Sequence, residues 1–170
     1  MKTKHVIVSP YDECWKQGFS EIRDVIQDAL GGLALRIEHV GSTSVQGLSA
    51  KPIIDIDVVI KDYSLLDTVV SALGKIGYRH EGNLGIVDRE AFSYEGDSTL
   101  YKHHLYVCTL DSMELKRHVA FRDYLRSHAD AVRAYSRIKE EGAALYPHDI
   151  EAYIRHKSSF IEAIYREIGI

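Results

Sequence analysis

The sequence of 170 residues is poor in cysteine and proline. Its two cysteines, Cys14 and Cys108, lie far apart and follow no metal-binding spacing, which argues against a disulfide framework and a cysteine metal site. Such thiols suit a reducing compartment, so the cytoplasm is the expected location. With only three prolines and no linker rich in Pro, Gly and Ser, residues 1–170 are expected to form one domain.

Long apolar runs and an excess of positive charge are also missing. No run approaches the roughly 20 apolar residues of a membrane-spanning helix, and residues 1–9 contain no apolar core of signal-peptide length. Acidic residues number 25 and basic residues 21, which gives a formal net charge of -4. Because binding of double-stranded DNA usually requires a clearly basic face, we expect neither double-stranded DNA nor a membrane as a partner.

Hydrophobic periodicity predicts an α+β fold. Apolar spacings of three and four predict helices at residues 13–30, 65–76, 111–127, 128–145 and 149–170. Runs of β-branched and aromatic residues predict strands at residues 33–40, 53–60, 78–83, 89–95 and 100–110. This order predicts a mixed β-sheet with helices on one side and a helical C-terminal portion at residues 111–170. Asp111 and Glu114 have the spacing of a capping box at the start of that portion.

Two carboxylates interrupt the most apolar strand. Asp55 and Asp57 are flanked by isoleucines and valines, and residues two apart in a strand point to the same face. Like charges this close repel each other and are tolerated where a divalent cation lies between them. The alternative is an edge strand with one polar face, for which aspartate is a poor choice. We therefore expect a metal site at this pair.

A turn of small residues follows the preceding strand. Gly41 allows close approach of an anion, while the hydroxyl groups and amides of Ser42 and Ser44 can bind phosphate. Glycine–serine turns are common, so this turn is informative because of its place, one strand before the aspartate pair.

Together these segments resemble the nucleotidyltransferase superfamily, in which an apolar-Gly-Ser turn precedes a strand with two metal-binding acids. The resemblance to one family within it, the GrpB family, covers nearly the whole chain. It is carried by residues 9–12, Trp15, residues 37–45, 51–57, 103–105 and 121–126, and by Tyr135, Lys139, Tyr153 and Lys157.

The resemblance implies metal-dependent transfer of a nucleotidyl group from a nucleoside triphosphate to a small acceptor. Asp55 and Asp57 would hold magnesium or manganese, and Gly41, Ser42 and Ser44 would bind the phosphates. Relatives fused to dephospho-coenzyme A kinase associate the family with nucleotide metabolism.

One departure concerns the third acid of the superfamily, which often serves as general base. The matching strand, at residues 100–110, contains no Asp or Glu. His104 shares a face with Tyr106 in that strand, and a histidine can act as base or as ligand near neutral pH. A site of two aspartates and His104 would favour manganese or zinc more than an all-oxygen site does. Alternatively, the base is lost and His104 only packs. We expect His103 or His104 to line the same cavity as Asp55, and prefer His104 because it shares a face with Tyr106.

Further cationic side chains are candidates for phosphate contacts. His39 precedes the turn, Lys51 precedes the acidic strand, and Lys157 and Arg122 lie in predicted helices. Each also has a structural alternative: a packed histidine for His39, plain surface for Lys51, and solvated helix faces or ion pairs for the other two.

Two functions from different classes remain. The first is an enzyme, a metal-dependent nucleotidyltransferase with His104 as base, or a phosphohydrolase that uses water as acceptor. The second is a non-catalytic nucleotide-binding or accessory module on the same fold, which the missing third carboxylate favours. The sequence leaves the acceptor, nucleotide, metal and oligomeric state open.

Overall fold

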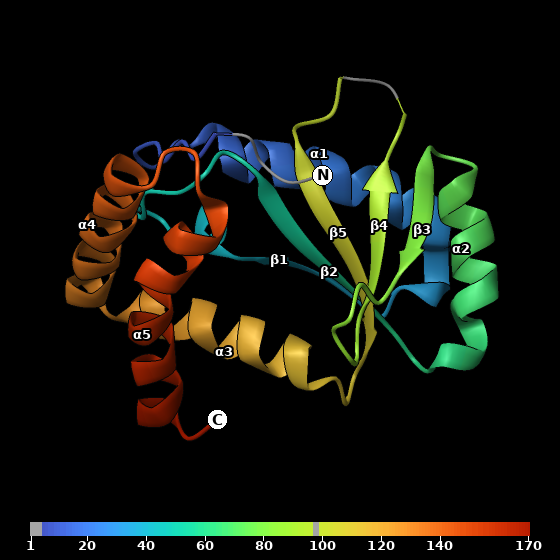
Figure 1. The fold of residues 1–170 in the computed structure, drawn as a ribbon. Coiled ribbons are helices and arrows are strands. Elements are labelled where there is room, and N and C mark those ends of the chain that lie inside the picture. Colours follow the sequence, from blue (N-terminus) through green and yellow to red (C-terminus); the bar gives the residue numbers. More distant parts are fainter. Residues whose placement is uncertain (1–4, 97–98) are drawn as a thin grey trace.

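The computed structural model of the protein describes residues 5–96 and 99–170. Part of the N-terminal segment in which no signal-peptide core was expected, residues 1–4, lies outside these ranges. The architecture is the expected mixed α+β arrangement (Figure 1). Across the described ranges, no helix is long and apolar enough to cross a membrane.

One sheet of five strands forms the centre of the molecule. The strands are β1 (Arg36–Val40), β2 (Ile54–Ile60), β3 (Tyr78–Gly82), β4 (Glu90–Tyr94) and β5 (His103–Thr109), in the spatial order β1-β2-β5-β4-β3. Only β2 and β5 pair in parallel, and the other neighbours are antiparallel. All five strands were predicted, with longer ends, because β-branched and aromatic residues mark them clearly.

One face of the sheet is covered by α1 (Cys14–Leu30) and α2 (Leu66–Gly74), which lie behind and beside the strands in Figure 1. The even-numbered residues of β2 point into this layer, which forms the main core with Ile22, Ile26 and Leu73. Because side chains alternate along a strand, the odd-numbered residues of β2 point to the opposite face. Asp55 and Asp57 therefore lie away from the main core.

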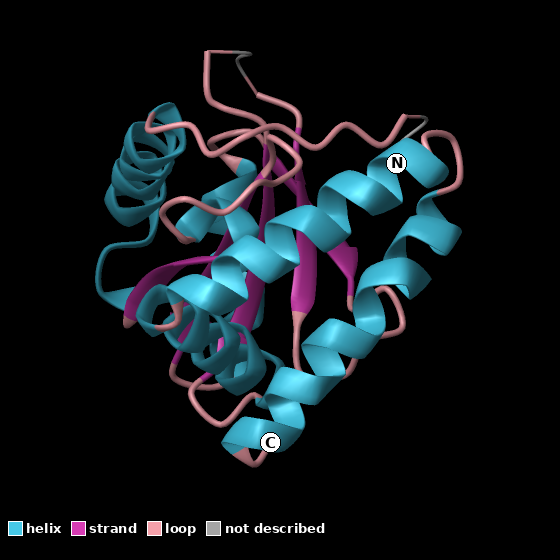
Figure 2. Ribbon diagram, turned by 90° about the vertical axis from the view of Figure 1, so that its left-hand side faces the viewer, coloured by secondary structure: helices cyan, strands magenta, loops and turns pink. Residues whose placement is uncertain are grey.

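The opposite face is covered at one end only, by α3 (Met113–Ser127). Leu115 of α3 packs against Val59 and Cys108, and Val119 joins this small cluster. Helices thus lie on both sides of the strands, as Figure 2 shows, whereas the sequence predicted them on one side. The difference arises because Val59 and Cys108 are apolar residues on the otherwise acidic face and need a cover.

Two further helices, α4 (Ala129–Leu145) and α5 (Ile150–Ile168), form the left-hand part of the molecule in Figure 1. They pack against α3 and against residues that follow the 41–44 turn, in a second core that contains Val45, Leu48, Leu125, Val132, Tyr135 and Ile164. The helical C-terminal portion therefore lies beside the open end of the sheet.

The helix ends show one wrong prediction. Ser112, and not Asp111, caps α3, because its hydroxyl accepts a hydrogen bond from the amide of Leu115. Asp111 instead accepts a hydrogen bond from Thr109. The cap of α5 is Asp149, which accepts from the amide of Ala152 as the sequence predicted.

Candidate functional site: an acidic strand facing a lysine pocket

The two aspartates lie side by side on the open part of the sheet. In the sheet register, Asp55 is opposite His104 and Asp57 is opposite Tyr106, so these side chains share one face. The exposed fraction is 33% for the Asp55 side chain and 3% for that of Asp57. The Asp55 carboxylate is therefore partly exposed to solvent, whereas the Asp57 carboxylate is buried next to α3.

Each aspartate has an imidazole partner. His104 Nδ1 lies 3.1 Å from Asp55 Oδ1, and half of the His104 side chain is exposed. His118 Nδ1, from α3, lies 2.7 Å from Asp57 Oδ2. Burial alone would lower the pKa of His118, but its hydrogen bond to Asp57 and the charge of that carboxylate raise the pKa above its usual value. The carboxylate thus favours the protonated form of His118, whose charge offsets that of the buried Asp57.

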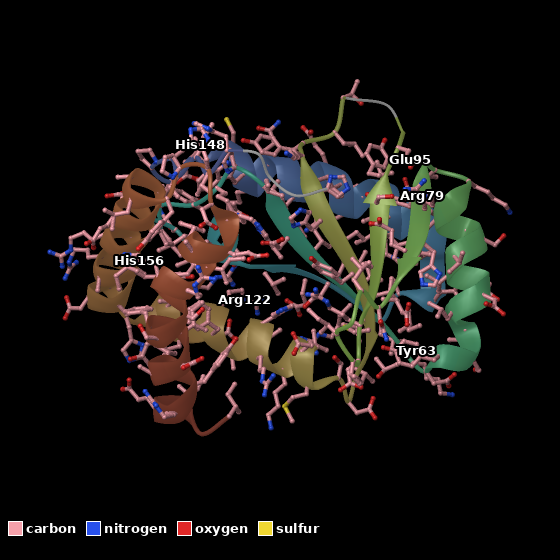
Figure 3. The ribbon with its side chains drawn as sticks, viewed as in Figure 1. Tyr63, Arg79, Glu95, Arg122, His148 and His156 are labelled. Atoms are coloured by element: carbon pink, nitrogen blue, oxygen red, sulfur yellow. The ribbon has the colours of Figure 1, made fainter. Side chains whose placement is uncertain are left out.

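A third carboxylate on this face, that of Glu38, is already engaged in an ion pair. Glu38 of β1 is opposite Asp57 in the register. Arg122 extends from α3 towards β1 (Figure 3), where its Nη1 donates to Glu38 Oε2 at 2.6 Å and to the His39 carbonyl at 3.0 Å. Burial would raise the pKa of Glu38, but hydrogen bonds from Arg122 and Arg36 lower it. Arg122 is therefore engaged in ion pairs, the structural alternative considered for it.

Gly41 and Asp55 are packed against each other. Gly41 has φ 71°, and a Cβ at this position would overlap the Asp55 carboxylate and lie 3.0 Å from the Asp55 Cβ. Both the backbone conformation and the available space therefore favour glycine. The sequence assigned Gly41 to close approach of phosphate, and the structure adds that it makes room for a candidate metal ligand.

The turn after Gly41 presents its residues to two different cavities. Ser42 and Thr43 line the cavity beside Asp55, whereas Thr43 and Ser44 line a larger one on the other side of the turn. The Ser44 hydroxyl donates to the Gly41 carbonyl. His39 points away from the aspartates, stacks on Phe19 and has its Nε2 2.9 Å from Thr43 Oγ1. Of these residues, Ser42 and Thr43 are placed to meet a ligand near Asp55.

A small cavity of about 130 Å³ beside Asp55 contains three lysines, and we call it the lysine pocket. Lys51 comes from the loop before β2, Lys139 from α4 and Lys157 from α5. The other residues of its wall are Ser42, Thr43, Ala50, Ile53, Asp55, His104 and Tyr153. Residues far apart in the sequence thus place three ammonium groups and one carboxylate around one small volume.

The three lysine side chains are partly or fully buried, so their charges are poorly solvated. Lys139 is only 2% exposed, and burial, followed by the charge of Lys157, lowers its pKa well below the usual value. Burial lowers the pKa of Lys157 to about 8, and that of Lys51 falls for the same reason. Among the described residues none of the three forms a salt bridge, although Asp55 raises each pKa through its charge. An anionic ligand would relieve this repulsion.

Aromatic rings line the pocket without satisfying its polar groups. The Nζ atoms of Lys51 and Lys157 lie 5.8 Å and 5.2 Å from the centre of the Tyr153 ring. The hydroxyl of Tyr153 is buried and has no hydrogen-bond partner in the described part of the chain. Native proteins rarely leave buried polar groups unpaired, so an orphaned hydroxyl here points to a ligand.

Comparison with known proteins identifies the family. The family model described as GrpB protein matches residues 5–167. The chain belongs to the GrpB family. Among its relatives are the UPF0157 protein YqkA of Bacillus subtilis, 31% identical over 89% of this chain, and the UPF0157 protein PA4798 of Pseudomonas aeruginosa, 37% identical over 92%. The chain spans only 44% and 65% of the lengths of these two proteins.

Solved structures confirm the fold. The crystal structure of GrpB from Enterococcus faecalis matches with a TM-score of 0.84 and 33% identity, over 95% of this chain and 96% of that one. Cid1 bound to the UTP analog UMPNPP matches with a TM-score of 0.54 and 9% identity, over 78% and 40% of the two chains. The GLD-2/RNP-8 complex matches with a TM-score of 0.60 and 14% identity, over 89% of this chain and 58% of that one. At such low identities the likeness shows the fold alone, which is that of nucleotidyltransferases.

A kinase also contains a related segment. The dephospho-CoA kinase of Mycolicibacterium paratuberculosis is 26% identical over 92% of this chain and 44% of its own length. The fusion implied by the family resemblance is therefore found among the relatives.

The structure brings together most of the residues singled out in the sequence. Asp55, His104, Ser42, Lys51 and Lys157 line one pocket, whereas Ser44 and His39 lie on the far side of the turn. His104 lines the cavity of Asp55, as expected. His103 faces the other side of the sheet, where its ring nitrogens lie 2.6 Å from the Tyr78 hydroxyl and from the Tyr101 carbonyl.

Sequence reasoning did not assign a site role to His118 or Lys139. A signal for Lys139 existed, because it follows Val132 and Tyr135 on the apolar stripe of its helix, where lysine is out of place. His118 gave no such signal, since its partner Asp57 is distant in sequence.

The donor groups fit a hard divalent cation only in part. Within the described ranges, no group of three or more His, Cys, Asp or Glu side chains is placed to hold a metal ion. Asp55 and Asp57 supply carboxylate oxygens on one face, and a magnesium-type ion is commonly held by one or two carboxylates together with substrate phosphates and water. The two carboxylates therefore fit such a metal only if further oxygen ligands complete its coordination.

Proposed function

We propose that the protein is a metal-dependent nucleotidyltransferase that uses a nucleoside triphosphate and a small acceptor. The observation that carries the proposal is the lysine pocket beside Asp55. It combines candidate metal ligands with uncompensated ammonium groups at one place, and a metal–triphosphate complex has the complementary charges. The fold supports the same class of reaction, since nucleotidyltransferases share it.

Asp55 and Asp57 are the residues that would hold the divalent cation. Such a cation, magnesium or manganese by the carboxylate donors, supplies charge neutralisation for the phosphates in an in-line displacement. His104 and His118 each have one ring nitrogen on a carboxylate oxygen and keep the two side chains in place. Zinc becomes an alternative if His104 moves from Asp55 to the metal.

The triphosphate would lie in the lysine pocket. Lys51, Lys139 and Lys157 provide positive charge, and Ser42 and the free hydroxyl of Tyr153 provide hydrogen-bond donors. Since Lys139 is almost fully buried, its charge acts more strongly than it would in solution. The main chain of the turn after Gly41 can add amide donors to the same anion.

Nucleotide binding by the purified protein tests the proposal. Calorimetry and thermal unfolding are measured with each common nucleoside triphosphate, with manganese or magnesium. We expect at least one nucleotide to bind in a metal-dependent way and raise the melting temperature. Asp55→Asn should remove the metal dependence, and Lys139→Met should weaken binding at least tenfold. Asp28→Asn, at an exposed site on α1, serves as control. Equal binding by wild type and Asp55→Asn would refute the proposal.

One observation favours the second candidate function, a nucleotide-binding module without chemistry. β5 carries His104 and Tyr106 on the acidic face and no carboxylate. Turnover decides between the two, measured as pyrophosphate or phosphate release over a set of acceptors. If His104 is the general base, His104→Ala should lower turnover about 10²–10⁴-fold and leave nucleotide affinity nearly unchanged. If the protein is a binding module, wild type and His104→Ala both bind the nucleotide and neither shows turnover.

A further inference from the structure

A second and larger cavity lies on the far side of the 41–44 turn from Asp55. Its volume is about 660 Å³, roughly five times that of the lysine pocket and in the range of small-molecule sites. α1, the turn, α3 and α4 form its walls, and Asp55 and Asp57 do not line it. We call it the cationic cavity.

Three helices each contribute one positive side chain to this cavity. These are Lys16 of α1, Arg126 of α3 and Arg133 of α4. Within the described chain its wall contains no carboxylate, and Lys16 and Arg126 form no ion pair. Arg133 is paired with Asp130 and contributes a weaker field. Two acidic residues outside the wall, Asp12 and Glu13, lie near Tyr11, which lines the cavity.

Arg126 is positioned so that part of its guanidinium remains available. Its Nε and Nη2 donate to the Ser44 carbonyl at 3.1 Å and 2.8 Å, while Nη1 has no partner among the described residues. Burial and the neighbouring Arg122 lower the pKa of Arg126, because its positive charge is poorly compensated. A fixed guanidinium with free donors is well suited to an oxyanion.

The rest of the wall suits a ligand with a carbon body. Leu125 and Val132 contribute apolar surface, and His39 and Tyr11 contribute ring surface. Burial lowers the pKa of His39 to about 4, so the ring is neutral near pH 7 and can donate one hydrogen bond. A bare phosphate ion would leave most of 660 Å³ unfilled.

We propose that the cationic cavity is a second ligand site, which binds a phosphorylated small molecule of about sugar-phosphate or nucleoside-monophosphate size. Lys16, Arg126 and Arg133 surround the phosphate, and the carbon body packs on Leu125 and Val132. The turn separates this site from the lysine pocket, since Thr43 lines both cavities and Arg126 donates to the Ser44 carbonyl.

Binding of defined probes without metal or nucleoside triphosphate tests this site independently of the proposed function. The probes are ribose 5-phosphate and adenosine 5′-monophosphate, with ribose, adenosine and inorganic phosphate for comparison. We expect saturable binding of a phosphorylated probe by calorimetry, and tighter binding of it than of inorganic phosphate or the uncharged compound. The double variant Lys16→Gln/Arg133→Gln should weaken it about tenfold.

Two further variants separate the cavities. Lys139→Met should leave the affinity of the phosphorylated probe unchanged, and Lys61→Gln, at an exposed lysine outside both cavities, should do the same. The proposal is overturned if no phosphorylated probe binds saturably at millimolar concentration. It is also overturned if Lys139→Met removes the binding while Lys16→Gln/Arg133→Gln leaves it intact, because the probe then occupies the lysine pocket.

Discussion

The absence of a side chain at Gly41 leaves room for the Asp55 carboxylate. The Asp55 carboxylate occupies the position that a Cβ on Gly41 would take. The orientation of Asp55 thus depends on a residue that has no functional group. A carboxylate that must point at a metal needs this kind of support from its surroundings.

We predict that Gly41→Ala abolishes manganese binding at Asp55 and Asp57. The added Cβ pushes the Asp55 carboxylate aside, and the backbone conformation of Gly41, which few residues other than glycine adopt, adds roughly 1–3 kcal/mol of strain. Calorimetric titration with manganese, in the presence of the nucleotide that binds, measures the effect. Gly32→Ala is the matched control, because a Cβ there meets nothing within 4 Å. Unchanged manganese binding by Gly41→Ala would contradict the prediction.

Lys157 gives the site a pH dependence whose sign follows from its pKa. That pKa is about 8 in the folded protein, below the usual 10.5. Only the protonated ammonium attracts phosphate, so we predict that nucleotide affinity falls as the pH rises through about 8. Calorimetry between pH 7 and pH 9 measures this, and Lys157→Met should show a flatter profile.

The stability of the unliganded protein should follow the opposite trend. Between pH 8 and about 10 the unfolded chain retains a proton on this lysine that the folded chain has released. The Lys157 contribution to the free energy of unfolding therefore rises with pH in that window. Denaturant unfolding of wild type and Lys157→Met at several pH values measures this contribution. The free energy of unfolding should rise more steeply with pH in wild type, and equal slopes would contradict the assigned pKa.

At the scale of secondary structure, α3 holds the acidic face together. It supplies His118 to Asp57 and Arg122 to Glu38, and its first turn covers Cys108. Its start is fixed by Ser112, whose side chain is buried and also donates to the Asp88 carbonyl at 2.8 Å. The position of two site residues thus depends on a cap outside the site.

We predict that Ser112→Ala destabilises the protein by about 1 kcal/mol or more. It removes the acceptor for the Leu115 amide, and caps typically contribute about this much. It also leaves the Asp88 carbonyl without its donor. Asp111→Ala is the natural control, because Asp111 is exposed and its carboxylate accepts a hydrogen bond from Thr109 rather than from an amide of α3. Denaturant titration compares the two, and a larger loss for Asp111→Ala would restore the capping box predicted from the sequence.

At the scale of the whole molecule, the site brings together segments that are far apart in the sequence. The candidate metal ligands lie on β2, whereas Lys139 and Lys157 lie on α4 and α5. A nucleotide bound as proposed would connect the sheet to the C-terminal helices. We predict slower amide hydrogen exchange across α5 when nucleotide and metal are present, measured by mass spectrometry, and no such change in Asp55→Asn. Protection confined to residues near β2 would place the phosphates elsewhere.

The sequence contained most of the fold and about half of the candidate site. Strands and helices were predicted because their apolar periodicity is local, and the pairing of Asp55 with Asp57 follows from the alternation of side chains in one strand. The convergence of Lys51, Lys139 and Lys157 could not be derived, because no local pattern specifies how two C-terminal helices dock. The position of α3 on the second face was missed for the same reason.

The parallel pairing of β2 with β5 has a consequence for folding. Residues 61–102, which include α2, β3 and β4, lie between these two central neighbours. Closing so long a loop costs chain entropy before any contact between the strands repays it, and such non-local pairing is slow. The hairpin of β3 and β4 is local and can form early. We therefore expect His104 to meet Asp55 late in folding, when β5 pairs with β2.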